Sequence, residues 1–206
     1  MTPSIQSISR RLASATRHPD RADQDAEIFA YAIKVLALNA TALAGIIMFS
    51  WLLGSLHTTV IIWAAAFSLR LFAGGRHQSG PVICWVLTVG VFTMLGFLVN
   101  TFARAAGEYV LLITALGLVL ALFTVVSSAP VTIPSKQFAP TKMRQLKMAA
   151  VAVVVFWATI ALAPLHGIFE QPVLPLGITT GLVIQSLFIL PVKFLPPTGH
   201  IGSRNT

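Results

Sequence analysis

The chain of 206 residues is too apolar for a soluble domain. Hydrophobic residues make up 56% of the sequence, charged residues make up 10%, and the mean hydropathy is +0.83. A soluble domain of this size carries roughly a quarter of its residues as charges. The composition therefore excludes a soluble fold and predicts a polytopic integral membrane protein.

The net charge of +8 does not indicate nucleic-acid binding. The basic residues lie in short clusters between apolar segments, without the stripe of basic and aromatic side chains that contacts nucleic acid. Such clusters are typical of an orientation signal in a membrane protein. The single cysteine, Cys84, excludes an internal disulfide.

Residues 1–30 are predicted to be a cytoplasmic or interfacial segment. They are polar and basic without an apolar core, so we do not expect a secretory signal peptide. Between residues 4 and 17, Ile5, Ile8 and Leu12 share one helical face, which suits an amphipathic helix at the membrane surface. A solvated beginning of the first spanning helix explains this short pattern equally well.

Six apolar segments follow, each close to the roughly 20 residues that cross a bilayer as a helix. Turn-rich breaks separate them, and the longest break runs from Ser128 to Lys147. We expect an all-α fold with six transmembrane helices over residues 31–195 and a tail at 196–206. The predicted helices lie at about 31–53, 56–73, 82–103, 109–127, 148–164 and 173–195.

The distribution of Lys and Arg predicts the orientation of these helices. Thirteen of the 14 basic residues fall in the N-terminal segment, the second and fourth loops, and the C-terminal end, whereas Arg104 falls on the other side. Cytoplasmic loops carry the excess of basic residues, so both termini are predicted to be cytoplasmic. All six acidic residues lie outside the apolar segments, which argues against an ion-coupled transporter or pump.

The segment from Arg70 to Cys84, on the predicted cytoplasmic side, contains the cysteine together with His77. A thiol and an imidazole are the minimum parts of a cysteine acyl-transfer site, because the imidazole takes the thiol proton and later protonates the leaving amine. On one continuous helix, residues seven apart are separated by about 10.5 Å along the axis, which is too far for direct proton transfer. The chain must therefore fold back to bring His77 over Cys84.

Local signals favour such a fold-back. Three glycines interrupt a helix between Gly74 and Gly80, and Pro81 suits the first turn of the third spanning helix. Cys84 then lies in that first turn, where free backbone N–H groups and the helix dipole favour a thiolate and an oxyanion. With no carboxylate nearby, we expect either a dyad without a third residue or a neutral partner that orients His77, such as Gln78, Ser79 or Gln185.

An inert role for Cys84 stays open on spacing alone, because a lone cysteine in a membrane helix is most often a small hydrophobe. However, the run RLFAGGRHQSGPVIC resembles the signature of the AgrB (accessory gene regulator B) family of bacterial membrane peptidases, in which Gly-x-His precedes Cys by seven positions. Gly75, His77 and Cys84 match this signature, and Arg70 falls where the family commonly has a basic residue.

The likeness extends over about residues 28–195. The further matching positions are Val35 to Asn39, Ala129–Pro130, a Lys-containing basic loop, Gly177, Gln185 and Leu190–Pro191. One departure is Ser135–Lys136–Gln137, where family members often have Asn-Lys-Pro. This departure bears on recognition of the substrate tail more than on catalysis.

The resemblance implies a cysteine endopeptidase of the bacterial cytoplasmic membrane with a Cys84–His77 dyad and no cofactor or metal. Arg70, Gly74, Gly75 and Gln185 are expected to support the dyad. The implied substrate is a short AgrD-like precursor peptide, which the enzyme cleaves at its acidic C-terminal tail and helps to cyclise to a thiolactone or lactone for quorum sensing. A homodimer is compatible with the resemblance alone.

Four basic residues are candidates for binding the acidic tail: Lys136, Lys142, Arg144 and Lys147. Anchoring of the cytoplasmic side explains them equally well. The alternative function from a different class is a membrane transporter or peptide exporter without covalent chemistry, in which Cys84 is dispensable. A lipid enzyme is disfavoured, since the sequence has neither paired intramembrane aspartates nor a clustered Arg/His phosphate signature.

Overall fold

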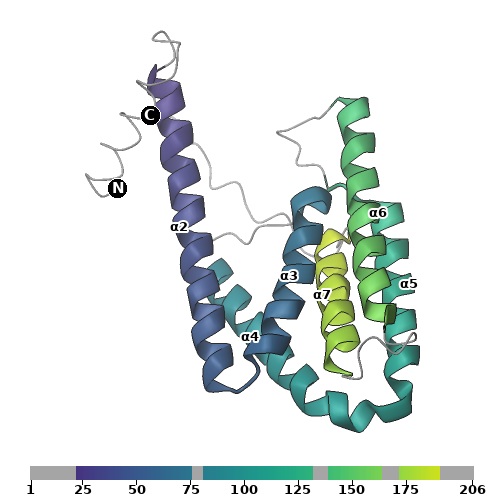
Figure 1. Cartoon of the computed structure of the whole chain (residues 1–206). Helices are drawn as coiled ribbons and strands as arrows, with labels where there is room; N and C mark the ends of the chain where they lie inside the picture. The colour runs from purple at the N-terminus through teal and green to yellow at the C-terminus, as the bar shows by residue number, and fades with distance from the viewer. Residues whose placement is uncertain (1–21, 76–80, 132–138, 164–171, 191–206) are drawn as a thin grey trace, which may run out of the picture. The chain divides into compact units, whose positions relative to one another are not determined.

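A computed structural model describes residues 22–75, 81–131, 139–163 and 172–190. Every regular element in these ranges is a helix, which confirms the predicted all-α class (Figure 1). The elements are α2 (Ala22–Leu52), α3 (Leu56–Ala73), α4 (Pro81–Ala106), the 3₁₀ helix η2 (Gly107–Tyr109), α5 (Val110–Ser128), α6 (Pro140–Leu162) and α7 (Val173–Ile189).

The chain divides into two compact units, residues 1–45 and residues 46–206. The described part of the first unit is the larger portion of α2. Two polar side chains within its apolar sequence bond back to carbonyls of the same helix: Asn39 Nδ2 donates to Val35 O at 2.9 Å, and Thr41 Oγ1 donates to Leu38 O at 3.0 Å. Such internal bonds let polar residues lie in a segment that is otherwise suited to lipid.

Among the described residues, five helices are long and apolar enough to cross a membrane by length and composition. Their apolar stretches are 35–52 in α2, 56–73 in α3, 82–103 in α4, 107–128 in η2 and α5, and 140–162 in α6. The sixth predicted span corresponds to α7, which is apolar but has 17 residues. Large apolar side chains such as Leu116 and Phe123 are 63% and 70% exposed, as expected for helices whose outer surface meets lipid tails.

Several helix ends differ from the predicted bounds. Helix α2 begins at Ala22 rather than near residue 31, and α6 begins at Pro140 rather than near residue 148. Both helices continue through polar residues, because Lys, Arg, Gln and Glu are good helix formers even where hydropathy is low. Helix α7 ends at Ile189 rather than near residue 195. The predicted amphipathic helix at 4–17 lies outside the described residues.

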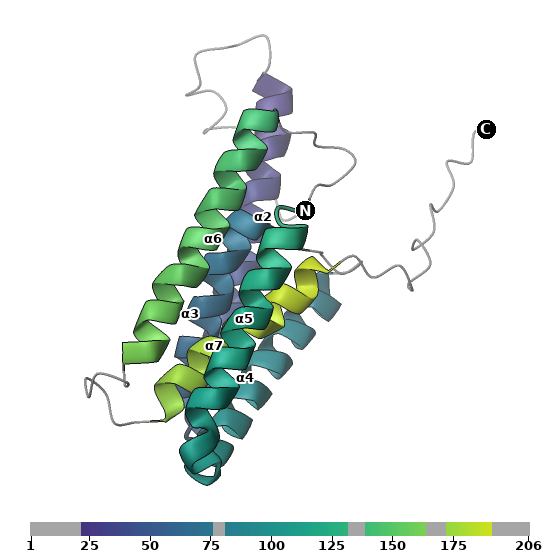
Figure 2. The same ribbon diagram turned by 90° about the vertical axis from the view of Figure 1, so that its right-hand side faces the viewer.

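Helix α7 forms the centre of the second unit. It packs against α3, α4, α5 and α6, and it lies between α3 and the pair of α5 and α6 in both views (Figure 1 and Figure 2). A Cβ atom on Gly181 would collide with the carbonyl oxygen of Ile62, so α3 and α7 approach closely only because that position is a glycine. The buried residues of α7 are Pro175, Leu176, Gly177, Ile178, Thr179, Gly181, Leu182, Gln185, Ser186 and Ile189.

Candidate active site

The end of α3 is the first part of the candidate site. After Ala73 the chain turns at Gly74, which has a φ of 75° and whose N–H donates to the carbonyl of Arg70 at 3.0 Å. A residue with a Cβ atom is strained at this φ, so glycine is required for the helix to end in this way. Helix α3 therefore ends at this glycine turn.

Gln185 reaches this turn from α7, 111 residues further along the sequence. Its side chain is 3% exposed, and its Nε2 atom donates to the carbonyl oxygen of Gly74 at 2.9 Å. A buried amide without a partner is costly, and here the partner is the backbone of the loop that precedes Cys84. The bond therefore connects the central helix to the glycine turn.

Gly75 lies against both Gln185 and Arg70. A Cβ atom on Gly75 would be 3.2 Å from Gln185 Nε2 and 3.8 Å from Cζ of the Arg70 guanidinium. Any side chain at position 75 would therefore press on the amide. The four residues expected to support the dyad, Arg70, Gly74, Gly75 and Gln185, lie together at one end of α3.

Val131 also contacts the turn, although the sequence did not single it out. Its N–H donates to the carbonyl of Ala73 at 3.0 Å, and its own carbonyl oxygen is 3.4 Å from the position of a Cβ atom on Gly74. Ala129–Pro130, joined by a cis peptide bond, leads from the end of α5 into this contact. Pro130 lies in a predicted break between helices, but no local sequence signal predicted that Val131 would contact Ala73.

Cys84 is the fourth residue of α4, which begins at Pro81 as predicted. The thiol is free and its side chain is partly buried. Its sequence neighbours Val82 and Ile83 are apolar and are 71% and 55% exposed. Figure 2 shows the beginning of α4 and the C-terminal end of α7 at the same end of the bundle.

His77 lies outside the described residues, as do Gln78, Ser79 and Lys136. The pairing of His77 with Cys84 thus stays a prediction. Among the residues that the structure describes, no group of three or more His, Cys, Asp or Glu residues could hold a metal ion.

The described basic residues of the predicted tail-binding set lie on the first turns of α6 and not in a loop. Lys142 and Arg144 are exposed and Lys147 is partly buried. At about 100° per residue, Arg144 and Lys147 are about 60° apart around the helix axis, whereas Lys142 is about 140–160° from both. The helix therefore separates Lys142 from the other two.

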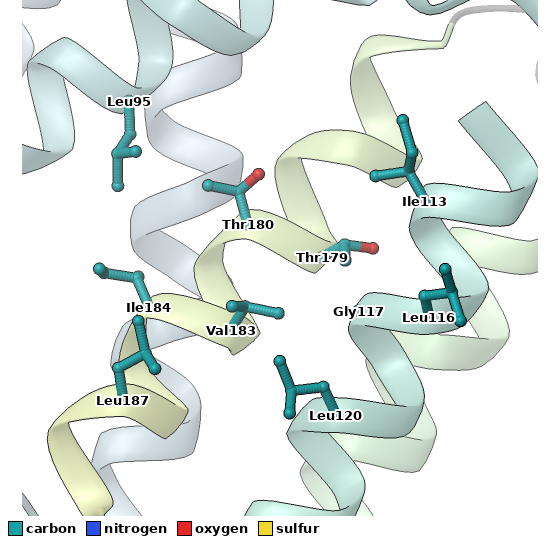
Figure 3. Close-up of a pocket in the computed structure, with 10 residues that line it drawn as sticks. All are labelled: Leu95, Ile113, Leu116, Gly117, Leu120, Thr179, Thr180, Val183, Ile184 and Leu187. Atoms are coloured by element: carbon teal, nitrogen blue, oxygen red, sulfur yellow. The ribbon is translucent and has the colours of Figure 1, made fainter. Parts of the chain in front are cut away.

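A separate pocket of about 410 Å³ lies between α4, α5 and α7 (Figure 3). Leu95 of α4, Leu116 and Leu120 of α5, and Val183 of α7 are among its lining residues. Its ten lining residues include neither a thiol nor a titratable group, so this pocket offers no acyl-transfer chemistry. The candidate active site is the glycine turn with the beginning of α4.

The apolar helices define a multi-pass helical membrane protein. Cys84 lies at the beginning of one candidate spanning helix, and the buried amide of Gln185 donates a hydrogen bond to the turn after the preceding helix. Its sequence matches the family model for accessory gene regulator B (AgrB) over residues 5–189, and the chain belongs to this family. Membership associates it with the agr quorum-sensing system.

Among individual proteins, the chain is similar to accessory gene regulator protein B of Staphylococcus intermedius. The two are 25% identical over 136 residues, which is 65% of this chain. The matched part likewise spans 65% of the length of that curated relative. No solved structure matches the chain.

Proposed function

We propose that this protein is a membrane-embedded cysteine endopeptidase that removes the C-terminal tail of an AgrD-like precursor peptide and promotes its cyclisation. The observation that carries the proposal is the position of Cys84 in the first turn of α4, after a loop whose beginning is held by Gln185. The family match supports the same chemistry, because it includes the whole segment from Arg70 to Cys84.

Acyl transfer begins when the imidazole of His77 takes the proton of the Cys84 thiol. The thiolate attacks the backbone carbonyl carbon at the junction of the peptide core and its tail, and the unpaired N–H groups of the first turn of α4 stabilise the oxyanion. The C–N bond then breaks, and the imidazolium protonates the leaving amine. The tail departs and the core stays on Cys84 as a thioester.

Cyclisation is a second exchange at the same carbonyl. A thiol or hydroxyl of the precursor loses its proton to His77 and attacks the thioester, whose C–S bond breaks as Cys84 recovers a proton. The product is a thiolactone or a lactone. Conversion of the amide to a thioester is uphill in free energy, whereas exchange of that thioester to a thiolactone is nearly level. Because no ATP is consumed, removal of the products must draw the reaction forward.

The surroundings of Cys84 suit this reaction. A thioester must be kept from water until the ring closes. The partly buried thiol and its exposed apolar neighbours, Val82 and Ile83, favour a membrane-bound peptide over bulk water. We further propose that α7 is the sixth span, that both termini are cytoplasmic, and that the site faces the cytoplasm of a bacterial cell membrane.

The test is co-expression with the AgrD-like precursor, followed by intact-mass spectrometry of protein and peptide. Cys84→Ala and His77→Ala are each expected to lower tail release by at least about 10³-fold, and the wild type is expected to carry a peptide adduct on Cys84. Gly90→Ala on the same helix is the control, because nothing lies within 4 Å of its added Cβ atom. Unchanged processing in Cys84→Ala would instead support a transporter without covalent chemistry.

A further inference from the structure

We propose that Gln185 is a positioning residue, which holds the loop that carries His77 in the orientation needed to pair with Cys84. The inference rests on the proposed function and assigns part of that site to a helix distant in sequence. The proposed role requires no contact of Gln185 with the thiol or the substrate. Gln185 acts through the carbonyl of Gly74, to which its amide donates.

Distant residues hold the backbone at the end of α3. The last carbonyl groups of a helix lack partners within the helix, and water usually satisfies them. Here two successive carbonyls are bonded by distant groups: Val131 N donates to Ala73 O at 3.0 Å, and Gln185 Nε2 donates to Gly74 O at 2.9 Å. Two separate elements thus fix the direction in which the chain leaves α3.

His77 follows this fixed point closely in the sequence. His77 follows Gly74 by three residues, which span at most about 10 Å when extended. Fixing the carbonyl of Gly74 therefore restricts the volume that the imidazole can occupy. Helix α7 also packs against α4, the helix that carries Cys84 in its first turn.

The amide group of Gln185 suits this position better than other side chains of similar size. Gln185 is a neutral donor that lies almost fully buried, at 3% exposure. Leucine has a similar size but no donor, and glutamate would bury a charge with no proton to offer the carbonyl. Gly75 leaves no spare room, because a Cβ atom there would be 3.2 Å from the amide nitrogen. The site therefore requires an amide at position 185.

The test compares Gln185→Leu and Gln185→Glu with Ser186→Ala in the full-length protein in detergent micelles. Ser186 is the adjacent buried residue, and its hydroxyl has no hydrogen-bond partner among the described residues. We expect both Gln185 variants to lower kcat for tail release at least about tenfold and to change KM less than about twofold, because misplacement of a catalytic group by 1 Å costs up to about a hundredfold. Ser186→Ala should match the wild type.

A double-mutant cycle separates positioning from general destabilisation. The rate of Cys84 alkylation by iodoacetamide is measurable even in inactive variants, and we expect His77→Ala to lower it and Gln185→Leu to lower it by a smaller factor. The double variant should be no slower than His77→Ala alone, because Gln185 acts through His77. If Gln185→Leu does not fold, Gln185→Asn, which keeps the amide on a shorter side chain, should show an intermediate loss of kcat.

Wild-type kcat in folded Gln185→Leu, or alkylation losses that multiply in the double variant, would overturn the positioning role while leaving the peptidase proposal intact. Retained tail release in Cys84→Ala or His77→Ala would instead remove the proposed function itself. The two failures are thus distinguished by different variants.

Discussion

The two turns at the ends of α3 are built in different ways. Both contain a glycine with positive φ, 64° at Gly54 and 75° at Gly74. The turn before α3 is closed by its own neighbours: Gly54 N donates to Trp51 O at 3.0 Å, and Ser55 N donates to Ser50 O at 2.9 Å. No atom lies within 4 Å of a Cβ atom placed on Gly54.

The turn after α3 is held instead by residues far away in the sequence. Val131 and Gln185 bond its two carbonyls, and Arg70 lies over Gly75. A hairpin between two membrane helices needs only the local solution that Gly54 provides. The additional contacts around Gly74 hold the backbone at the end of α3, which is the end that precedes His77 and Cys84 in the sequence.

Separation of α7 from α3 should remove the contact between Gln185 and Gly74, and it is expected to have the largest effect. Gly181→Leu would drive a side chain into the backbone of Ile62, and overpacking of this kind costs about 1–3 kcal/mol. We expect a lower melting temperature in micelles and a loss of tail release of at least about a hundredfold, because Gln185 moves away from Gly74. The local turn at Gly54 should be unaffected.

Gly90→Leu is the matched control, since a Cβ atom at Gly90 meets nothing within 4 Å. It adds the same side chain to an exposed position of α4 and should leave both the melting temperature and tail release unchanged. Full activity in Gly181→Leu would contradict the view that close packing of α7 supports the site.

A more selective comparison substitutes the two glycines themselves. Gly54→Ala and Gly74→Ala each force alanine to a positive φ, which costs about 1–3 kcal/mol. A loss of unfolding free energy is therefore expected for both variants in denaturant titrations. Tail release per folded molecule should fall at least about tenfold in Gly74→Ala and stay near wild type in Gly54→Ala. Equal activity losses would show that the remote contacts at Gly74 have no special role.

The features that sequence predicted well depend on local physics. The bounds of α3 were predicted at 56–73, because its apolar segment ends at glycine turns on both sides. Pro81 opens α4 as expected, since proline is tolerated in a first turn and breaks a helix elsewhere. The supporting set of Arg70, Gly74, Gly75 and Gln185 came from a family resemblance, and the structure brings these residues together.

The features that sequence did not predict depend on packing between distant segments. The bond from Gln185 to Gly74 joins residues 111 apart, and it exists only because glycines let α7 approach α3. Val131 offers no distinctive chemistry of its own, since its contribution is a backbone N–H group. The sequence did not predict that α6 begins at Pro140, because hydropathy identifies the membrane-crossing part of a helix and not the polar turns that precede it.

The smallest expected effect tests whether the basic residues of α6 contribute to the site at all. Because the helix turns Lys142 away from Arg144 and Lys147, an acidic tail lying on one face meets the latter two. Arg144→Gln and Lys147→Gln should each raise KM for the precursor about two- to fivefold at low salt, and this effect should fade at high ionic strength. Lys142→Gln removes the same charge and should change KM less. Equal effects of all three substitutions would mean that only net charge matters, as expected for anchoring of the cytoplasmic side.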